Sequence, residues 1–287
     1  MDEIRTWQQA MDYTFKTRHS WRHGNGSKTS RINCNHFTRL RGNSFPIKKI
    51  NQANVTGVCI ELEDEGKSDA TINRVVSAIS TVLNHCAFDG LIDHAPKFRR
   101  RSESEGRVLW YTKDEVNQLS LLSTEVFMRE DLRDIIMFAA YTGMRQGEIL
   151  KIRAKDIDLV ANKIHVGGVP TQTTKAKNWR AIPIHDTIKA LVHNRHSAVT
   201  RSDTQLFGDE WRDKDQLLRA FKKVNRLLPK EDSYVFHTLR HSYATWLAEA
   251  GVPIRSIMAL CGHKRIETTL RYAKATDAAL TDAMAAI

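Results

Sequence analysis

Two imidazoles and a guanidinium share one turn of an expected helix in the stretch FHTLRHSYATWL, residues 236–247. His237 and His241 are four residues apart and lie on one helix face, as in half of a common zinc motif. Thr238 stands where that motif has its glutamate, and the fixed charge of Arg240 opposes a metal cation. His237 and Arg240 can instead donate hydrogen bonds to a phosphate or a carboxylate. The pattern favours an anion site over zinc, beside the plainer alternative of an amphipathic helix with solvated charges.

Three further segments carry groups of related chemistry. YTGMRQGEILKI places Arg145 three residues before Glu148, and TTKAKNWRAIPI places Lys175 on an expected hairpin. LCGHKRIETTLRYAK places His263 nine residues before Tyr272. Each residue alone has an ordinary explanation. Arg145 could form a salt bridge with Glu148, Lys175 could be a solvated turn lysine, and Tyr272 could be a core aromatic. The order Arg, Lys, His-x-x-Arg, His and Tyr is far more specific than its parts.

This set of motifs resembles the tyrosine recombinase family, which includes the phage integrases and the Xer-type recombinases. TGMRQGE fits the family's T-G-x-R-x-x-E box at every fixed position, and HTLRH fits its H-x-L-R-H motif. LCGHKRIETTLRY fits the L-x-G-H motif that a tyrosine follows. The resemblance is close over residues 107–275. Cys261 stands where the family usually has an apolar residue, and Lys274 where it often has histidine, but neither position is catalytic.

The resemblance implies how these residues would act on a phosphodiester. Arg145 and Arg240 would hold the non-bridging oxygens and stabilise the charge of the transition state. His237 and His263 would add hydrogen bonds to the same oxygens. Tyr272 is the implied nucleophile, and its pKa of about 10 means that nearby cations or a base must help it to ionise. Either histidine could take its proton.

The remaining implied roles complete the reaction. Lys175 would act as the general acid that protonates the leaving 5′-oxygen. Glu148 is expected to orient Arg145 or a histidine, and His241 is expected to be a buried supporting group. A 3′-phosphotyrosine would store the energy of the diester. We therefore expect no ATP, no other cofactor and no metal site.

These implications predict a site-specific DNA recombinase that integrates or excises a phage or another mobile element. Two alternatives stay open: a Xer-type resolvase, and a sequence-specific DNA-binding protein that has lost catalysis. Double-stranded DNA is the expected partner, bound by a homotetramer on two DNA sites that would be a monomer or dimer off DNA. The resemblance also admits accessory DNA-bending or directionality proteins.

The composition of the whole chain agrees with a polyanionic partner. Its 287 residues carry 44 Lys and Arg against 33 Asp and Glu, a formal charge of +11. The four cysteines lack C-x-x-C spacing, so neither a disulfide framework nor a zinc ribbon is indicated. The N-terminal stretch has no apolar signal region, and no run of about 18 apolar residues occurs. We expect a protein without a membrane segment, in the cytoplasm of a bacterial or phage-infected cell, on DNA.

The helix and strand patterns along the chain predict a mostly α fold with a small antiparallel sheet in the catalytic domain. These elements must position the residues named above. Residues 1–93 are expected to form a helical core-binding domain that contacts DNA. Residues 94–106, HAPKFRRRSESEG, are polar and charged and are the best linker candidate. Residues 107–287 are expected to form a mixed α+β catalytic domain of the tyrosine recombinase type.

Positive charge is concentrated near the N-terminus, where residues 1–49 hold ten Lys and Arg against three Asp and Glu. Basic side chains there and in the expected linker are candidates for contacts with DNA phosphates. These candidates are Arg31, Arg39, Arg41, Lys48, Lys49, Arg99, Arg100 and Arg101.

The C-terminal tail AKATDAALTDAMAAI, residues 273–287, has a weak apolar stripe and predicts a short helix. Such a helix is marginal alone in water, so it needs an apolar groove. The resemblance implies a groove on a neighbouring protomer, and packing on its own domain or a frayed end remain alternatives.

Overall fold

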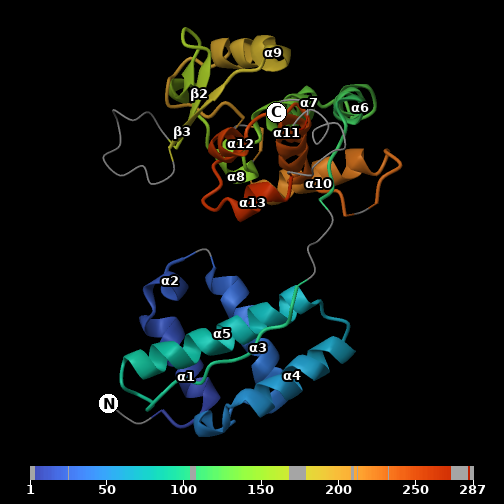
Figure 1. Ribbon diagram of the computed structural model, residues 1–287. Helices are drawn as coiled ribbons and strands as arrows, with labels where there is room; N and C mark the ends of the chain where they lie inside the picture. The colour runs from blue at the N-terminus through green and yellow to red at the C-terminus, as the bar shows by residue number, and fades with distance from the viewer. Residues whose placement is uncertain are drawn as a thin grey trace. The chain divides into compact units, whose positions relative to one another are not determined.

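A computed structural model gives the fold of the chain, which divides into two compact units, Met1–Gly106 and Arg107–Ile287 (Figure 1). The residues that it describes are 4–24, 26–103, 108–167, 179–207, 210–211, 213–231, 233–272 and 284. The predicted fold class, mostly helical with one small antiparallel sheet, is confirmed. Within the described part of the chain, no helix is both long and apolar enough to cross a membrane.

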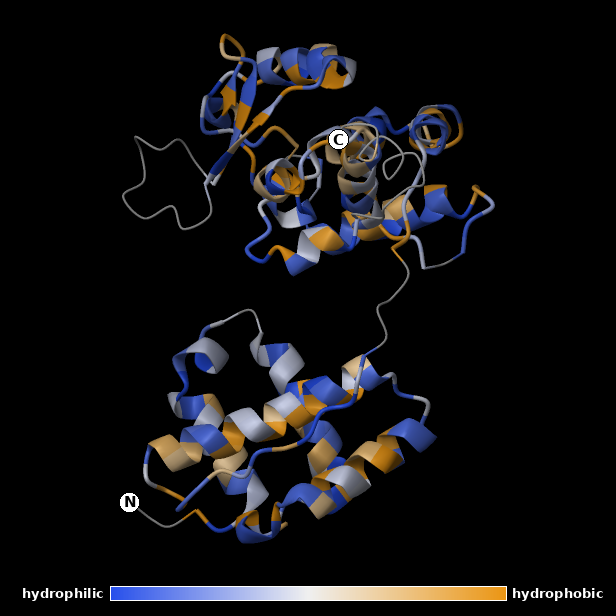
Figure 2. Ribbon diagram, viewed as in Figure 1, coloured by the Kyte–Doolittle hydropathy of each residue, from blue (hydrophilic) through white to orange (hydrophobic). Residues whose placement is uncertain are grey.

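The first unit is helical. Its elements are α1 (Trp7–Thr17), α2 (His19–Arg22), α3 (Ser27–Arg41), the 3-10 helix η1 (Ile47–Lys49), α4 (Gln52–Asp64) and α5 (Asp69–Phe88). Apolar and polar residues alternate along these helices (Figure 2), and the apolar faces enclose a core that includes Trp7, Phe37 and Ile79. The hydroxyl of Ser68 accepts a hydrogen bond from the backbone N–H of Thr71 and so caps the N-terminus of α5.

The segment expected to link the two domains makes specific contacts with the helices that precede it. Its described part, residues 94–103, lies against the first unit. Phe98 packs on the apolar core, and Asn73 exchanges hydrogen bonds with the backbone of Arg101. The Arg101 guanidinium pairs with Glu63 and Asp69 at 2.7 and 3.1 Å. The charge of Arg101 therefore anchors this segment to α4 and α5, whereas Arg99 and Arg100 are exposed.

The second unit is mixed. Its helices are α6 (Lys113–Glu125), α7 (Glu130–Thr142), α8 (Gln146–Ile149), η2 (Ala154–Asp156), α9 (Asp186–Ser197), α10 (Lys214–Asn225), α11 (Thr238–Glu249), α12 (Ile254–Cys261) and α13 (Glu267–Leu270). Strands β1 (Ile157–Asp158), β2 (Lys163–Val166) and β3 (Arg180–Pro183) form an antiparallel sheet in the order β1-β2-β3. In its register Ile164 faces Ile182, and both are fully buried.

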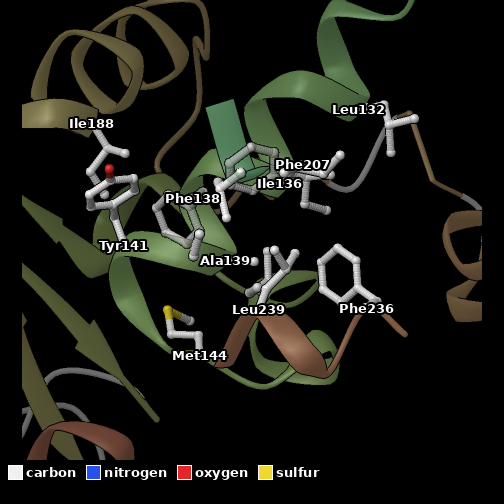
Figure 3. Close-up of a cluster of buried hydrophobic side chains, with 14 of the residues drawn as sticks. Leu132, Ile136, Phe138, Ala139, Tyr141, Met144, Ile188, Phe207, Phe236 and Leu239 are labelled. Carbon is white, nitrogen blue, oxygen red and sulfur yellow. The ribbon is translucent and has the colours of Figure 1, made fainter. Parts of the chain in front are cut away.

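The core of the second unit fixes the backbone beside two of the predicted catalytic arginines. Figure 3 shows side chains of α7 gathered with Met144 and Leu239 in one buried cluster. Arg145 follows Met144, and Arg240 follows Leu239, in the chain. Because core side chains are close-packed, anchoring these two neighbours limits where each guanidinium can reach.

A glycine ends α7 just before Arg145. Gly143 has a φ of +61°, and its N–H bonds to the carbonyl of Ala139. A Cβ at this position would come within 2.3 Å of the Tyr243 ring. Both the left-handed backbone and this close approach require glycine here, so α7 stops where Arg145 is needed.

Candidate active site

Arg145 stands at the N-terminus of α8, held by Glu148. The Arg145 backbone N–H donates to Oε2 of Glu148 at 2.9 Å, and its Nη1 donates to Oε1 at 3.1 Å. Its Nη2 donates to the carbonyl of Gly262 at 3.2 Å. The side chain keeps 44% exposure. A fixed but accessible guanidinium of this kind can bind an anion bidentately.

Glu148 is itself held by Arg180, a residue that the sequence analysis did not single out. Nη2 and Nη1 of Arg180 donate to the two oxygens of Glu148 at 2.7 and 3.2 Å. Burial opposes ionisation of Glu148, but these bonds, the Arg145 N–H and both arginine charges outweigh it and lower its pKa to about 2. Glu148 is therefore a carboxylate at neutral pH, and its hydrogen bonds fix the direction of the Arg145 side chain.

Arg180 also connects β3 to the last turn of α12. Its Nε donates to the carbonyl of Leu260 at 2.9 Å, and the residue is 8% exposed. Gly262 has a φ of +65°, and a Cβ there would approach Nη1 of Arg180 to 2.8 Å. The L-C-G-H turn can pass this close to Arg180 because position 262 is glycine.

Arg240 lies deeper, with 3% exposure. Its Nη1 donates to the carbonyl of Gly143 at 2.6 Å and its Nη2 to that of Cys261 at 2.5 Å. Burial, reinforced by the charge of Arg145, lowers its pKa to about 10, so it stays cationic at neutral pH. Arg240 thus joins the segments TGMRQGE, HTLRH and LCGH, which are far apart in the sequence.

The two histidines that the sequence proposed for phosphate contacts flank this pair of arginines. His263 is half-buried, and its Nδ1 shares a hydrogen bond of 2.8 Å with the Thr269 hydroxyl. Burial and the charges of Arg240 and Arg145 lower its pKa to about 4. His237, the residue before α11, is more open, and partial desolvation with the same arginine charges lowers its pKa as well. Both imidazoles are neutral at pH 7.

Tyr272 lies beside these groups and is 7% exposed. Its ring stacks on His263 with centroids 6.2 Å apart and planes 8° apart. Its hydroxyl lies 2.5 Å from Nδ1 of His241. Burial raises the pKa of Tyr272 above its ordinary value. His241, expected to be a supporting group, is thus in direct contact with the predicted nucleophile.

A cleft opens beside Arg145. Arg145, Glu148, Arg180 and His263 line this cleft together with exposed basic residues, among them Arg255. This surplus of positive charge suits a phosphodiester. Among the described residues, no cluster of three or more His, Cys, Asp or Glu could hold a metal ion.

Two predictions fall outside the described residues. Lys175 lies in the stretch 168–178, and the tail 273–287 is described at Met284 alone. Their roles therefore stay predictions.

The candidate DNA contacts fall into groups. Arg39 pairs with Glu65 at 2.6 Å, and Arg41 pairs with Glu61 at 2.7 Å. Arg31 lies over the ring of Phe15, 4.0 Å from its centroid. Arg101 is paired within the first unit, as described above. The remaining candidates are exposed; they are Lys48, Lys49, Arg99 and Arg100.

Known proteins resemble this chain in sequence. The model of the phage integrase family matches residues 110–279. The tyrosine recombinase XerA of Thermococcus kodakarensis is 31% identical over 222 residues, which cover 75% of this chain and 74% of that protein. The tyrosine recombinase XerD of Oceanobacillus iheyensis is 27% identical over 249 residues, which cover 82% of this chain and 81% of that protein.

Solved structures share the fold. The Tn1549 transposon integrase, in complex with transposon right end DNA, superposes with a TM-score of 0.76 at 18% identity and covers 98% of this chain and 99% of that one. A lambda integrase dimer bound to a COC' core site gives a TM-score of 0.73 at 20% identity and covers 94% of this chain and 77% of that one.

Proposed function

The chain belongs to the phage integrase family, the tyrosine recombinases, and from that premise we propose how its own residues cut and rejoin DNA. It is an enzyme of site-specific DNA recombination. The observation that carries the proposal is the meeting of Arg145, Arg240, His263 and Tyr272 around the turn at Gly262. These residues come from the three motifs that the sequence analysis singled out.

Binding of the scissile phosphate falls to Arg145 and Arg240. Arg145 is open to solvent while Glu148 fixes its direction, so it can donate two parallel hydrogen bonds to non-bridging oxygens. Arg240 supplies a second positive charge from a buried position, where electrostatic interactions are stronger than in water. His263 and His237 add hydrogen bonds as neutral donors. All these groups stabilise the charge that builds up in the pentacoordinate transition state.

Tyr272 attacks the phosphorus through its hydroxyl oxygen. The bond from phosphorus to the 5′-oxygen breaks, and the strand stays attached to the protein as a 3′-phosphotyrosine. Lys175 donates the proton that the leaving 5′-oxygen takes up. A free 5′-hydroxyl of a partner strand then attacks the phosphotyrosine, which rejoins the DNA without ATP.

A nicked suicide substrate tests this proposal, because loss of the short 5′-hydroxyl fragment traps the covalent adduct. We expect an adduct with the wild-type protein in EDTA and none with Tyr272→Phe, which should still bind the same DNA. An adduct formed by Tyr272→Phe would show that the nucleophile is another residue. Strict dependence on a divalent metal would contradict the phosphate chemistry.

We assign the biological role to integration or excision of a phage or another mobile element. The likeness of fold to a transposon integrase and a phage integrase supports this role. A Xer-type resolvase is the second candidate, supported by similarity to XerD and XerA over most of their lengths. Mapping the covalent adduct on genomic DNA separates the two. An integrase marks the ends of an element, whereas a resolvase marks one chromosomal site outside any element.

The first unit is assigned to DNA binding, as the core-binding domain of the sequence prediction. Its concentration of basic residues near the N-terminus supports this assignment. Two such domains and two catalytic domains on each DNA duplex would give a homotetramer on two sites, with accessory DNA-bending or directionality proteins as further partners. The cytoplasm of a bacterial or phage-infected cell is the proposed location.

A further inference from the structure

We propose that His241 is the catalytic residue that receives the phenolic proton of Tyr272 during strand cleavage. This inference rests on the proposed function, in which Tyr272 is the nucleophile. It differs from the roles that the family resemblance implied, where His237 or His263 could be the base and His241 was a supporting group.

The contacts of His237, His241 and His263 show which of them can reach the Tyr272 hydroxyl. Nδ1 of His241 lies 2.5 Å from the Tyr272 hydroxyl, which is hydrogen-bond distance. His263 lies parallel to the Tyr272 ring, and its Nδ1 is engaged with Thr269. His237 packs edge-on against the His241 ring at 5.0 Å. A general base must reach the proton that it removes, and the described geometry gives that reach to His241.

The surroundings of His241 keep Nδ1 free of a proton before the reaction. Its own helix contributes His237 and Arg240, and the opposing segments contribute His263, Arg271 and Tyr272. Burial and the charges of these neighbours lower the pKa of His241 to about 4. The imidazole is therefore neutral at pH 7. The proposal assigns its proton to Nε2, which leaves the lone pair of Nδ1 to accept the Tyr272 O–H.

The same surroundings make the proton transfer depend on DNA. A protonated His241 beside Arg240 and Arg271 is unfavourable in the protein alone, since like charges at short range repel. The scissile diester brings one negative charge to Arg240 and Arg145, and a second develops in the transition state. This added negative charge offsets the positive charges of the two arginines, and it therefore raises the pKa of His241 when the attack occurs. Tyr272 therefore stays a protonated phenol until a phosphate is in place.

The step balances. The O–H bond of Tyr272 breaks and its proton moves to Nδ1 of His241, while the phenolic oxygen bonds to phosphorus and the 5′-oxygen leaves with the proton of the general acid. In the rejoining step a 5′-hydroxyl gives its proton to the deprotonated general acid and displaces the phenolic oxygen, which takes its proton back from His241. One residue thus serves as base in cleavage and as acid in rejoining.

Two substitutions separate proton transfer from positioning. His241→Asn places an amide oxygen near the former Nδ1, where it can accept the hydrogen bond but cannot take the proton. His241→Ala removes both functions. His193→Asn, at an exposed histidine on α9, is the matched control. Adduct formation is followed in single turnovers on the suicide substrate between pH 5 and 9, with DNA affinity and circular dichroism measured for each variant.

We expect His241→Ala and His241→Asn to lose about 100-fold or more in rate near pH 7, the range of general base catalysis, with DNA affinity unchanged. The rate of His241→Asn should then rise about tenfold per pH unit, because phenolate must form by loss of a proton to solvent. The wild-type rate should level off at lower pH. A 5′-bridging phosphorothiolate, whose sulfur leaves without a proton, should rescue Lys175→Ala but neither His241 variant.

Three outcomes overturn the proposal. A near wild-type rate and pH profile for His241→Asn would mean that His241 merely holds the hydroxyl. Faster cleavage by either variant would mean that His241 restrains Tyr272 at rest. Rescue of the His241 variants by the phosphorothiolate would place His241 on the leaving-group side. Failure of the proposed function is distinct, since the wild-type protein itself would then form no adduct.

Discussion

Glu148→Gln removes one charge from the centre of the catalytic unit while keeping the shape of the side chain. The glutamine leaves Arg180 buried without its carboxylate partner, and it weakens the hold on Arg145. An unpaired buried charge is costly, so we expect the free energy of unfolding to fall. Gln also mimics protonated Glu148. The loss in free energy of unfolding at each pH can therefore be calculated from the pKa of Glu148.

The pKa of Glu148 gives the size of the effect. Its value of about 2 lies well below the ordinary value of 4.5. Each unit of difference in pKa corresponds to about 1.4 kcal/mol. A depressed pKa stabilises the folded state above the unfolded pKa, and this stabilisation is lost as the pH falls through the folded pKa. The ion pairs therefore contribute about 3 kcal/mol at pH 7, about 1.4 kcal/mol at pH 3 and almost nothing below pH 2.

Urea unfolding of both proteins at pH 7, 5, 4 and 3 measures this contribution. The difference between wild type and Glu148→Gln should stay constant from pH 7 to 5 and shrink by about half by pH 3. Glu249→Gln, at an exposed position at the end of α11, is the control and should change stability little at any pH. A loss for Glu148→Gln that is equally large at pH 7 and pH 3 would refute the electrostatic argument and assign the effect to packing.

Further expectations concern catalysis, binding and assembly. Arg145→Ala should slow adduct formation about 100-fold or more with DNA binding retained, as for loss of a transition-state donor; a loss below tenfold would contradict its role. Arg180→Met should also slow cleavage, and combining it with Arg145→Ala should cost less than the product of the two single effects, because Arg180 acts through Arg145. DNA affinity should fall steeply between about 50 and 200 mM salt, and a flat dependence in gel-shift titrations would argue against phosphate contacts. Deleting residues 276–287 should leave single-site binding intact and weaken synapsis; unchanged tetramer formation would exclude docking in trans.

Local signals in the sequence predicted much of the scaffold. Ser68 stands directly before the apolar repeat of α5 and Gly90 just beyond its end, and Gly143 follows α7, so the sequence carries start and stop signals at these helix ends. These signals work because the first and last turns of a helix need capping groups that a sequence displays. The spacing of the motifs likewise identified Arg145 and Arg240 before their backbone partners were known.

The Arg180–Glu148 ion pair and the contact of His241 with Tyr272 could not be predicted in the same way. Arg180 lies in β3 and meets Glu148 across 32 residues of sequence, a pairing that depends on how the sheet packs against α8 and α12. His241 was visible beside Arg240, but its partner Tyr272 lies 31 residues further on. A basic residue directly before the apolar stretch AIPI was the one available signal for Arg180, since buried arginines require an acidic partner.

Burial and the balance of charge in this site together explain why its histidines are neutral and why that helps catalysis. Arg145, Arg180 and Arg240 carry three positive charges at the Gly262 turn, and Glu148 is the carboxylate that pairs with two of them. Burial first, and then neighbouring positive charges, lower the pKa of His263 and His241 to about 4, so neither adds further positive charge. A phosphodiester brings one negative charge, and its pentacoordinate transition state carries two. Because the surplus exceeds one charge, the site stabilises the transition state more than the bound diester, and this difference is what accelerates a reaction.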